Sequence, residues 1–160
     1  MLLERSADVG AGPLRLLDVP VPEPGAGQVL VRVRVCGVCR TDLHIVEGDL
    51  PLVKRPIIPG HETVGIVDRT GAGVRSVKEG DRVGIAWLQG TCGQCEFCRN
   101  GRENLCTRAT FSGYDMDGGY AEYALVSEAF LYPIPAVFSD EEAAPLLCAG
   151  IIGYRALRLS

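Results

Sequence analysis

Four cysteines stand close together in the middle of the chain, where Cys92, Cys95, Cys98 and Cys106 form a C-x2-C-x2-C-x7-C pattern. Four thiolates in so short a segment can surround one tetrahedral ion, and thiolates prefer zinc, with Zn–S distances of about 2.3 Å. A site with four protein ligands has no open position for chemistry. The pattern therefore predicts a structural zinc lobe at about residues 90–108. A set of free surface thiols is the weaker alternative.

A second group of candidate metal ligands is spread along the chain. Cys39 and Cys148 lie on either side of His61 in the sequence, and His61 is one of only two histidines. Two thiolates and one imidazole would leave the fourth position of a zinc ion open to water or substrate, as in a catalytic site. We therefore expect up to two zinc ions per chain. A histidine satisfied within the core is the alternative for His61.

The remaining cysteine near this group is Cys36, which forms a C-x-x-C pair with Cys39. Cys36 continues the alternation of a predicted strand, so we interpret it as a small buried hydrophobe. A redox pair with Cys39 is the alternative.

Composition limits the classes of function. The chain has 160 residues, enough for one domain with its own core, with 22% charged residues and a formal net charge of −4. General attraction to nucleic acid or to an anionic membrane is not expected at this charge. No apolar run approaches roughly 18 residues, and the first residues lack a signal-peptide pattern. We expect a cytoplasmic protein whose reduced cysteines bind metal in preference to forming disulfides.

The first part of the chain shows the patterns of strands separated by turns. Residues 29–35 alternate valine with mostly polar side chains after a Pro-Glu-Pro-Gly loop, which indicates a half-buried strand. Further strands are predicted at 63–67, 83–87 and 120–126. Short strands with glycine-rich turns between them favour a mainly β domain, a barrel or a sandwich.

Helical signals begin after Pro135. Ser139 and Glu142 have the spacing of a capping box. A helix is predicted to continue over 143–148, which Pro145 allows only near the helix start. Residues 151–159 are also predicted to be helical.

A dinucleotide-binding glycine motif is missing from the chain. Gly71-Ala72-Gly73 lacks the third glycine, because Ser76 stands in its place, and no helix pattern follows. We interpret this segment as a turn.

Several motifs together resemble one family. Cys-Gly-Val-Cys-Arg-Thr-Asp-Leu-His over 36–44, Gly-His-Glu over 60–62, Gly-Asp-Arg-Val over 80–83 and the four-cysteine pattern occur in order. With these motifs the chain resembles the zinc-containing medium-chain alcohol dehydrogenases. The resemblance implies a mainly β fold with short helices, a GroES-like β-barrel catalytic domain that carries the four-cysteine zinc lobe.

The resemblance also implies domain boundaries. Residues 1–147 would form the GroES-like zinc-binding catalytic domain, and 148–160 a linker helix leading into a Rossmann coenzyme domain that is truncated at the C-terminus of this chain. The family's final segment, which returns to the catalytic domain, would be absent as well. The full-length parent would form a homodimer or homotetramer.

The implied activity is oxidation of an alcohol to an aldehyde or ketone, with hydride transfer from a zinc-bound alkoxide to NAD or NADP. Cys39, His61 and Cys148 would hold the catalytic zinc. The four clustered cysteines would hold the structural zinc. The isolated chain is expected to be inactive, because no segment cradles a dinucleotide, and the residue that selects NAD or NADP would lie in the absent domain.

Four further residues acquire roles around the catalytic zinc through the resemblance. Thr41 would take the alcohol proton, and His44 would pass it to solvent. Asp42 would orient the ligand histidine. Glu62 would be the acidic neighbour of the metal. A surface histidine and a plain N-cap or turn residue are the alternatives for His44 and Asp42.

Three other positions concern cofactor and substrate. Arg40 would meet the cofactor pyrophosphate, and Ile152 would lie near the nicotinamide, where many relatives have threonine. Trp87 would line the substrate pocket and favour small alcohols, with an ordinary core position as its alternative.

Other functions are compatible with the same residues. The scaffold could act on another carbinol, such as a polyol, an amino-acid alcohol such as threonine, or a formaldehyde adduct. Zinc-free quinone reductases are disfavoured, because they lack these ligands. A non-enzymatic zinc-binding module is the alternative from a different class, although the lobe has few basic or aromatic residues for binding nucleic acid.

Overall fold

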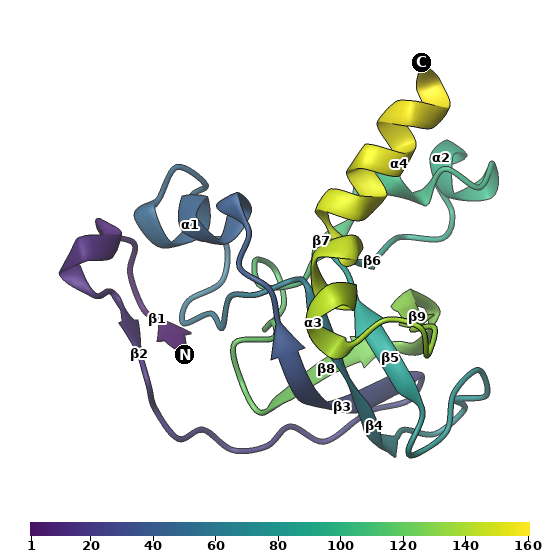
Figure 1. Cartoon of the computed structure of the whole chain (residues 1–160), viewed down its shortest axis with the longest axis horizontal. Helices are drawn as coiled ribbons and strands as arrows, with labels where there is room; N and C mark the ends of the chain where they lie inside the picture. Colours follow the sequence, from purple (N-terminus) through teal and green to yellow (C-terminus); the bar gives the residue numbers. More distant parts are fainter.

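The computed structural model describes all 160 residues as a curled antiparallel sheet with small helical and hairpin additions (Figure 1). The strands are β1 Leu2–Leu3, β2 Leu14–Arg15, β3 Gln28–Cys36, β4 Thr63–Thr70, β5 Arg82–Ile85, β6 Leu88–Gly90, β7 Thr110–Phe111, β8 Tyr123–Ser127 and β9 Leu131–Pro133. The α-helices are α1 Arg40–Glu47, α2 Glu96–Arg99, α3 Asp140–Ala143 and α4 Ala149–Leu159. Short 3-10 helices are η1 Val9–Ala11, η2 Glu103–Leu105, η3 Glu128–Phe130 and η4 Ala144–Leu147.

The central sheet has the strand order β8-β3-β4-β5-β9, and every neighbouring pair in it is antiparallel. The predicted alternation of β3 is confirmed, since Val29 and Val31 are buried while Arg32 and Arg34 are exposed. A strand with one apolar face can be stable only where a core covers that face. This mainly β architecture with short helices confirms the predicted fold class.

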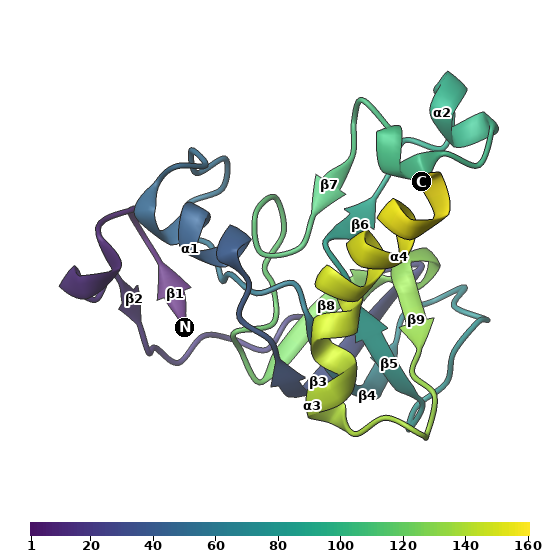
Figure 2. The ribbon, with the colours of Figure 1, turned by 45° about the horizontal axis from the view of Figure 1, so that its top comes forward.

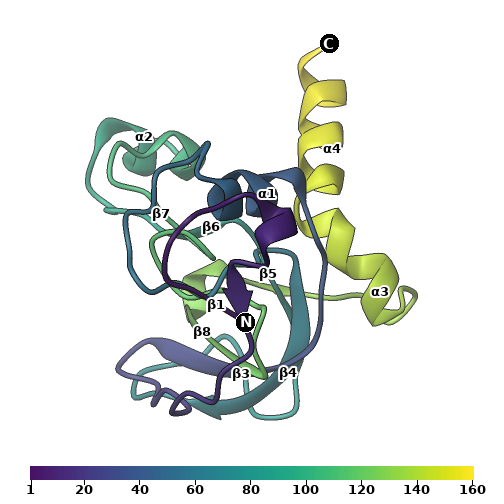
Figure 3. The same ribbon diagram turned by 90° about the vertical axis from the view of Figure 1, so that its left-hand side faces the viewer.

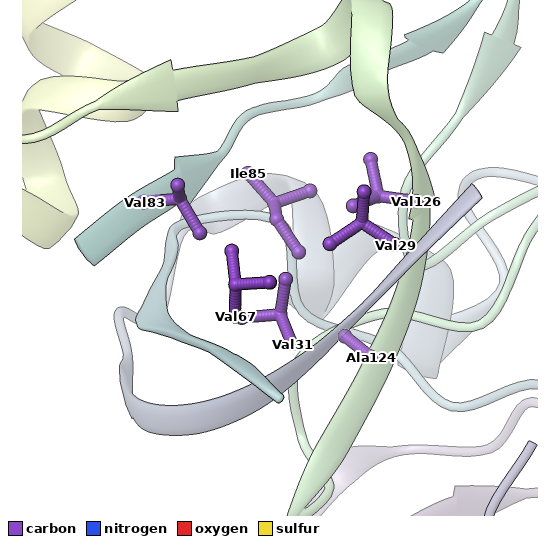
Figure 4. Packing of buried hydrophobic residues seen from close by; sticks show 7 residues of the cluster. All are labelled: Val29, Val31, Val67, Val83, Ile85, Ala124 and Val126. Carbon is purple, nitrogen blue, oxygen red and sulfur yellow. The ribbon is translucent and has the colours of Figure 1, made fainter. Parts of the chain in front are cut away.

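The main core lies inside the curl of the sheet. Seven buried aliphatic side chains from four of its strands pack together there (Figure 4). They are Val29, Val31, Val67, Val83, Ile85, Ala124 and Val126. All seven residues belong to strands of the sheet, so this core forms without side chains from the helices.

The end of the β3–β4 ladder matters most for the site. Cys36 pairs with Thr63 as the last residues in register. The ladder then continues for one more bond, from the Gly37 N–H to the Glu62 carbonyl at 2.9 Å. Two loops therefore leave the same end of the sheet side by side, one toward α1 and the other just before β4.

The segment after Pro135 packs on the sheet through a second small core. Ser139 caps α3, with its Oγ accepting the Glu142 N–H at 3.2 Å and the Glu142 carboxylate accepting the Ser139 N–H at 2.9 Å, so the predicted capping box is confirmed. Leu147 rests directly on Gly84, where an added Cβ would lie 2.9 Å from the leucine methyl groups. This close approach requires glycine in β5.

Helix α4 stands away from the sheet, with the C-terminus at its tip (Figures 1 and 3). None of its residues is buried, and Ile152, Tyr154 and Leu157 are more than half exposed. The helix predicted over 151–159 is confirmed and begins two residues earlier.

None of the helices combines the length and the apolarity that crossing a membrane requires.

Two predicted strands are shorter than the sequence pattern suggested. The strand expected at 83–87 ends at Ile85, because the Trp87 carbonyl accepts the Ser112 N–H at 2.8 Å, outside the main ladder. The strand expected at 120–126 begins at Tyr123. The N–H groups of residues 118–120 donate to the 58–60 loop, so this part of the expected strand lies outside the ladder.

The predicted helix over 143–148 is also corrected. Ala144–Leu147 forms a 3-10 helix, with Pro145 among its first residues. Proline has no N–H for an α-helical bond, so it fits the first turn of a short, tight helix and not the middle of a longer one. The predicted turn at 71–73 is confirmed, with Gly73 at φ 83°.

Candidate functional site

The first candidate metal site is the loop between β6 and β7, residues 91–109, called the cysteine lobe here; it projects beyond those strands (Figure 2). The four cysteine sulfurs of the lobe lie within 4.8 Å of one another. Cys98 Sγ is 3.9 Å from Cys92 Sγ and 3.5 Å from Cys95 Sγ. Zinc–sulfur bonds of about 2.3 Å at a tetrahedral angle give S–S separations of about 3.8 Å. A disulfide would need about 2.05 Å.

Backbone N–H groups in the lobe point at its sulfurs. The Cys95 N–H donates to Cys92 Sγ at 3.4 Å, and Cys106 Sγ accepts the N–H groups of Cys92 and Arg108, each at 3.4 Å. Such bonds stabilise thiolates, and the N–H groups of Gln94 and Cys95 lower the pKa of Cys92 to about 5. Burial raises the pKa of Cys98 to about 11, so the backbone favours the thiolate at Cys92 but not at every sulfur of the lobe.

The second candidate site joins three distant parts of the chain. Cys39 caps the start of α1, His61 lies in the loop before β4, and Cys148 lies at the junction of η4 and α4. Ligand atoms of these residues and of Glu62 lie within 4.8 Å of one another. The Sγ atoms of Cys39 and Cys148 are 3.7 Å apart, again the separation expected between two thiolates on one zinc ion. We call Cys39, His61 and Cys148 the three-ligand centre.

Asp42 holds two parts of this centre together. Its Oδ1 accepts hydrogen bonds from His61 Nδ1 at 2.9 Å and from the Gly60 N–H at 3.1 Å. Its Oδ2 accepts the Cys39 N–H at 2.9 Å. The carboxylate is buried, and with His61 Nδ1 donating to it, the lone pair of the neutral imidazole lies on Nε2. The predicted neighbour of the ligand histidine thus lies against it, and Nε2 is the nitrogen left for a metal.

The thiols of the three-ligand centre differ in acidity. Burial raises the pKa of Cys148 to about 12. Burial also acts to raise the pKa of Cys39, but the backbone N–H and hydroxyl of Thr41 outweigh it, and the pKa is lowered. Burial raises the pKa of Glu62. Protons thus remain on the centre until a cation displaces them, so metal binding here releases protons.

His61 has a pKa raised above its ordinary value, although its burial acts in the opposite direction. The hydrogen bond to Asp42 and the charge of that carboxylate outweigh the burial. A cation at Nε2 would therefore compete with a proton for the same lone pair.

The predicted proton-transfer residues lie on α1. Thr41 Oγ1 is 3.7 Å from Cys39 Sγ, so its hydroxyl lies next to the three-ligand centre. His44 lies one turn further on, and its Nδ1 is 2.7 Å from Asp49 Oδ2 near the surface. No direct hydrogen bond joins Thr41 to His44, so a relay between them needs an intervening group.

Trp87 forms an aromatic wall beside His61. The two ring centroids are 5.0 Å apart with the planes at 73°, and Phe111 stacks on the other side of the indole at 4.9 Å. Trp87 also packs against the buried cluster of Leu3, Ile45, Val46 and Ile57. The core alternative for Trp87 agrees with this packing, and its role in a substrate pocket stays a prediction.

The predicted cofactor residues are exposed. Arg40 is the first residue of α1, directly after the ligand Cys39, and Ile152 is 62% exposed on α4, one turn beyond Cys148. Arg40 thus adjoins a candidate metal ligand in the chain, and the Ile152 N–H donates to the carbonyl of another, Cys148, at 3.0 Å.

Three positions around the centre were not singled out from the sequence. A Cβ on Gly37 would come 2.1 Å from Glu62 Oε2, so this carboxylate occupies the space beside a glycine. Tyr120 Oη donates to the Gly37 carbonyl at 3.4 Å, and burial followed by the charge of Asp42 raises its pKa. Thr63 donates its hydroxyl to Cys36 Sγ at 3.3 Å. Of these three positions, only Gly37 carries a signal in the sequence, because it lies between Cys36 and Cys39.

Cys36 is a half-buried thiol and is not bonded to Cys39, since all seven cysteines are free. Burial raises its pKa to about 11, which favours the neutral thiol. This is the behaviour of a small packing residue and not of a reactive thiolate.

A cavity of about 880 Å³ lies outside the set of candidate ligands. It runs between the extended segment 16–22 and the strands β3 and β8. Cys39, His61 and Cys148 do not line it.

Known proteins are similar to this chain in sequence. A family model for the alcohol dehydrogenase GroES-like domain matches residues 25–136. A probable alcohol dehydrogenase of Mycobacterium tuberculosis is 51% identical over 97% of this chain and 46% of its own length, and an alcohol dehydrogenase of Geobacillus stearothermophilus is 49% identical over 92% and 44%. The chain thus spans about half the length of the curated relatives it matches.

Solved structures show the same fold. A cinnamyl alcohol dehydrogenase from Sorghum bicolor superposes with a TM-score of 0.86 at 32% identity, over 96% of this chain and 46% of that one. A thermostable alcohol dehydrogenase from Pyrobaculum aerophilum, described as cobalt and zinc bound, gives a TM-score of 0.84 at 34% identity, over 97% and 47%.

Proposed function

The chain belongs to the alcohol dehydrogenase family that carries the GroES-like domain, and from this premise we propose that it is the zinc-binding catalytic part of an alcohol dehydrogenase. The parent enzyme oxidises an alcohol to an aldehyde or ketone, and NAD or NADP accepts the hydride. Residues 1–147 form the catalytic domain in this proposal. Residues 148–160 lead into the coenzyme domain.

The observation that carries the proposal is the convergence of Cys39, His61 and Cys148. The two sulfurs are 3.7 Å apart, and Asp42 occupies His61 Nδ1 so that Nε2 is left for a cation. This donor set fits zinc in the catalytic arrangement, in which three protein ligands leave one position open. A zinc ion bound there supplies a Lewis acid for a substrate oxygen.

The residues around the centre have separate tasks. The Thr41 hydroxyl, next to Cys39 Sγ, accepts the proton of the alcohol. His44, at the surface with Asp49, exchanges that proton with solvent, and water links the two side chains. Asp42 keeps His61 in one tautomer and one orientation. Trp87 closes one side of the site and limits the size of the substrate.

Glu62 is the fourth residue of the ligand cluster and its only carboxylate. Its carboxylate lies within 4.8 Å of the ligand atoms and beside Gly37, which leaves no room for another side chain. We assign it the role of a charged neighbour that can approach the metal.

The cysteine lobe holds a second zinc in this proposal, through all four of its thiolates. With no open position, that zinc stabilises the lobe and takes no part in the reaction. Arg40 and Ile152 contact the nicotinamide cofactor from the catalytic side, and the parent forms a homodimer or homotetramer.

The test uses the full-length parent with an alcohol and NAD or NADP. Cys148→Ser should abolish cofactor reduction and release about one equivalent of zinc, because it removes one of three ligands. Cys36→Ala is the matched control, because it deletes a thiol that is not a proposed ligand and should retain activity. Full activity of Cys148→Ser would exclude the proposed centre.

A further inference from the structure

Residues 118–120 run alongside the loop that carries His61. Gly118 donates its N–H to the Ile58 carbonyl at 2.7 Å, and Tyr120 donates its N–H to the Pro59 carbonyl at 3.0 Å. The Gly119 N–H donates to the Gly60 carbonyl at 3.0 Å. This short contact leads up to the residue before the histidine.

The side chain of Tyr120 reaches across to the loop that carries Cys39. Its ring lies against Gly60, where an added Cβ would come 2.7 Å from ring atom Cδ1. Its hydroxyl donates to the Gly37 carbonyl at 3.4 Å. One side chain thus contacts both loops that leave the end of the β3–β4 ladder.

This contact complements the one made by Asp42. Asp42 lies on α1 and bonds to the Cys39 N–H, the Gly60 N–H and His61. Tyr120 reaches the same two loops from another element, just before β8. Gly60 has φ 101°, a conformation that residues other than glycine rarely adopt. Because glycine restricts its own backbone little, contacts from neighbouring residues must hold the loop in this path.

We propose that Tyr120 is a positioning residue for the three-ligand centre, which sets the distance between Cys39 and His61 by holding Gly37 and Gly60 in place. The inference rests on the proposed zinc centre and extends it to a residue that touches neither metal nor substrate. Groups that hydrogen-bond directly to metal ligands typically change the metal affinity roughly 10–100-fold when they are lost, and we take this range as the upper bound for Tyr120.

The test is a cobalt(II) titration of the metal-free protein, with the absorption bands of each bound ion as the readout. The wild type should bind two equivalents, and Cys148→Ser identifies the bands of the three-ligand centre by their loss. Tyr120→Leu removes the ring and should weaken cobalt binding at that centre by up to roughly 100-fold and shift its bands, with the lobe unchanged.

Two further variants separate positioning from packing. Tyr120→Phe keeps the ring against Gly60 and should restore most of the affinity, since it loses only the bond to Gly37. Tyr132→Leu removes a tyrosine from β9 that is 39% exposed, and it should change neither site.

The outcomes distinguish this inference from the proposed function. If the wild type binds cobalt only in the lobe, the proposed centre fails and the role of Tyr120 falls with it. If the wild type binds two ions and Tyr120→Leu binds both with unchanged affinity and bands, only the inference about Tyr120 is overturned. Equal weakening of both sites would also overturn it, because it would show a general loss of packing.

Discussion

The cysteine lobe and the three-ligand centre are built in opposite ways from the same kind of ligand. The four sulfurs of the lobe come from one segment between β6 and β7, and the N–H groups that face them belong to that segment too. Cys39, His61 and Cys148 come from three segments that meet only when the sheet and its helices are in place. A site can therefore be local or can depend on the whole fold.

The difference extends to the neighbours of each site. At the three-ligand centre, Asp42 bonds to His61 and to the loop of Cys39, while Leu147 fixes the segment of Cys148 on Gly84. Changes far from the metal should therefore disturb this centre and leave the lobe intact. The predictions below begin with the largest expected effect.

The largest effect is expected inside the lobe. Cys98→Ser should remove one of four thiolates and with it the lobe zinc, because zinc binding in such a segment supplies much of its folding free energy. Hydrogen exchange of residues 91–109 should become fast, while the sheet stays protected. Protected lobe amides in a variant without lobe zinc would show that the lobe folds without metal.

Asp42→Ala is the matching change at the other centre. It removes the acceptor of three hydrogen bonds and should weaken zinc binding there roughly 10–100-fold, leaving the lobe unchanged. Each buried donor left without a partner should also cost about 1–3 kcal/mol of folding stability. Competition with a chelating dye measures the affinity. Glu23→Ala, which removes an exposed carboxylate that pairs with Arg69, is the control. Equal affinity in Asp42→Ala and wild type would contradict this role.

Leu147→Ala tests the third segment. Leu147 is 7% exposed and packs on Gly84, so its truncation should destabilise the fold by about 2–5 kcal/mol and loosen the neighbouring ligand Cys148. Urea unfolding of the metal-free protein measures the first effect and zinc affinity the second. Leu146→Ala, at a position that is 42% exposed, should change both much less.

Alkaline pH should weaken the end of the β3–β4 ladder. Burial raises the pKa of Cys36 from its usual 9.0 to about 11, so the folded protein keeps a proton that the unfolded chain has lost. This contribution is full below about pH 9 and is lost as pH rises through about 11, with a size on the order of 2 kcal/mol. Unfolding of the metal-free protein at several pH values measures it, and Cys36→Ala should remove the part of the decline due to this thiol.

Thr41→Ala should have the smallest effect on metal. The hydroxyl lies beside Cys39 Sγ and is not a proposed ligand, so zinc content should stay at the wild-type value. Turnover of the full-length parent should nevertheless fall roughly 10²–10⁴-fold, the range for a positioned proton acceptor. His44→Gln should cost less, because water replaces an exposed group. Wild-type turnover in Thr41→Ala would remove Thr41 from the proton path.

The cysteine lobe can be predicted from the sequence more completely than the three-ligand centre, and the reason is physical. Spacing alone identifies the lobe, since its four ligands share one short segment. The three-ligand set is suggested by residue types, but its assignment rests on the family resemblance, because nothing local links residue 39 to residue 148. Tyr120 could not be predicted at all, since its contact with Gly37 spans 83 residues of sequence.

The strands show the same limit. The valine alternation of β3 predicts its buried face, but the end of β5 depends on a partner, because the carbonyl of Trp87 pairs with Ser112 and not with the main sheet. Which segment pairs with a strand end depends on the three-dimensional fold and not on the local sequence. Local patterns therefore predict which elements form better than where they end.

The most direct test of the two-site account is zinc release from the protein into an excess of chelator, followed over time. The account predicts two equivalents, one released quickly from the open three-ligand centre and one slowly from the closed lobe. Cys148→Ser should remove only the fast phase and Cys98→Ser only the slow phase. A single equivalent, or a fast phase that persists in Cys148→Ser, would contradict it.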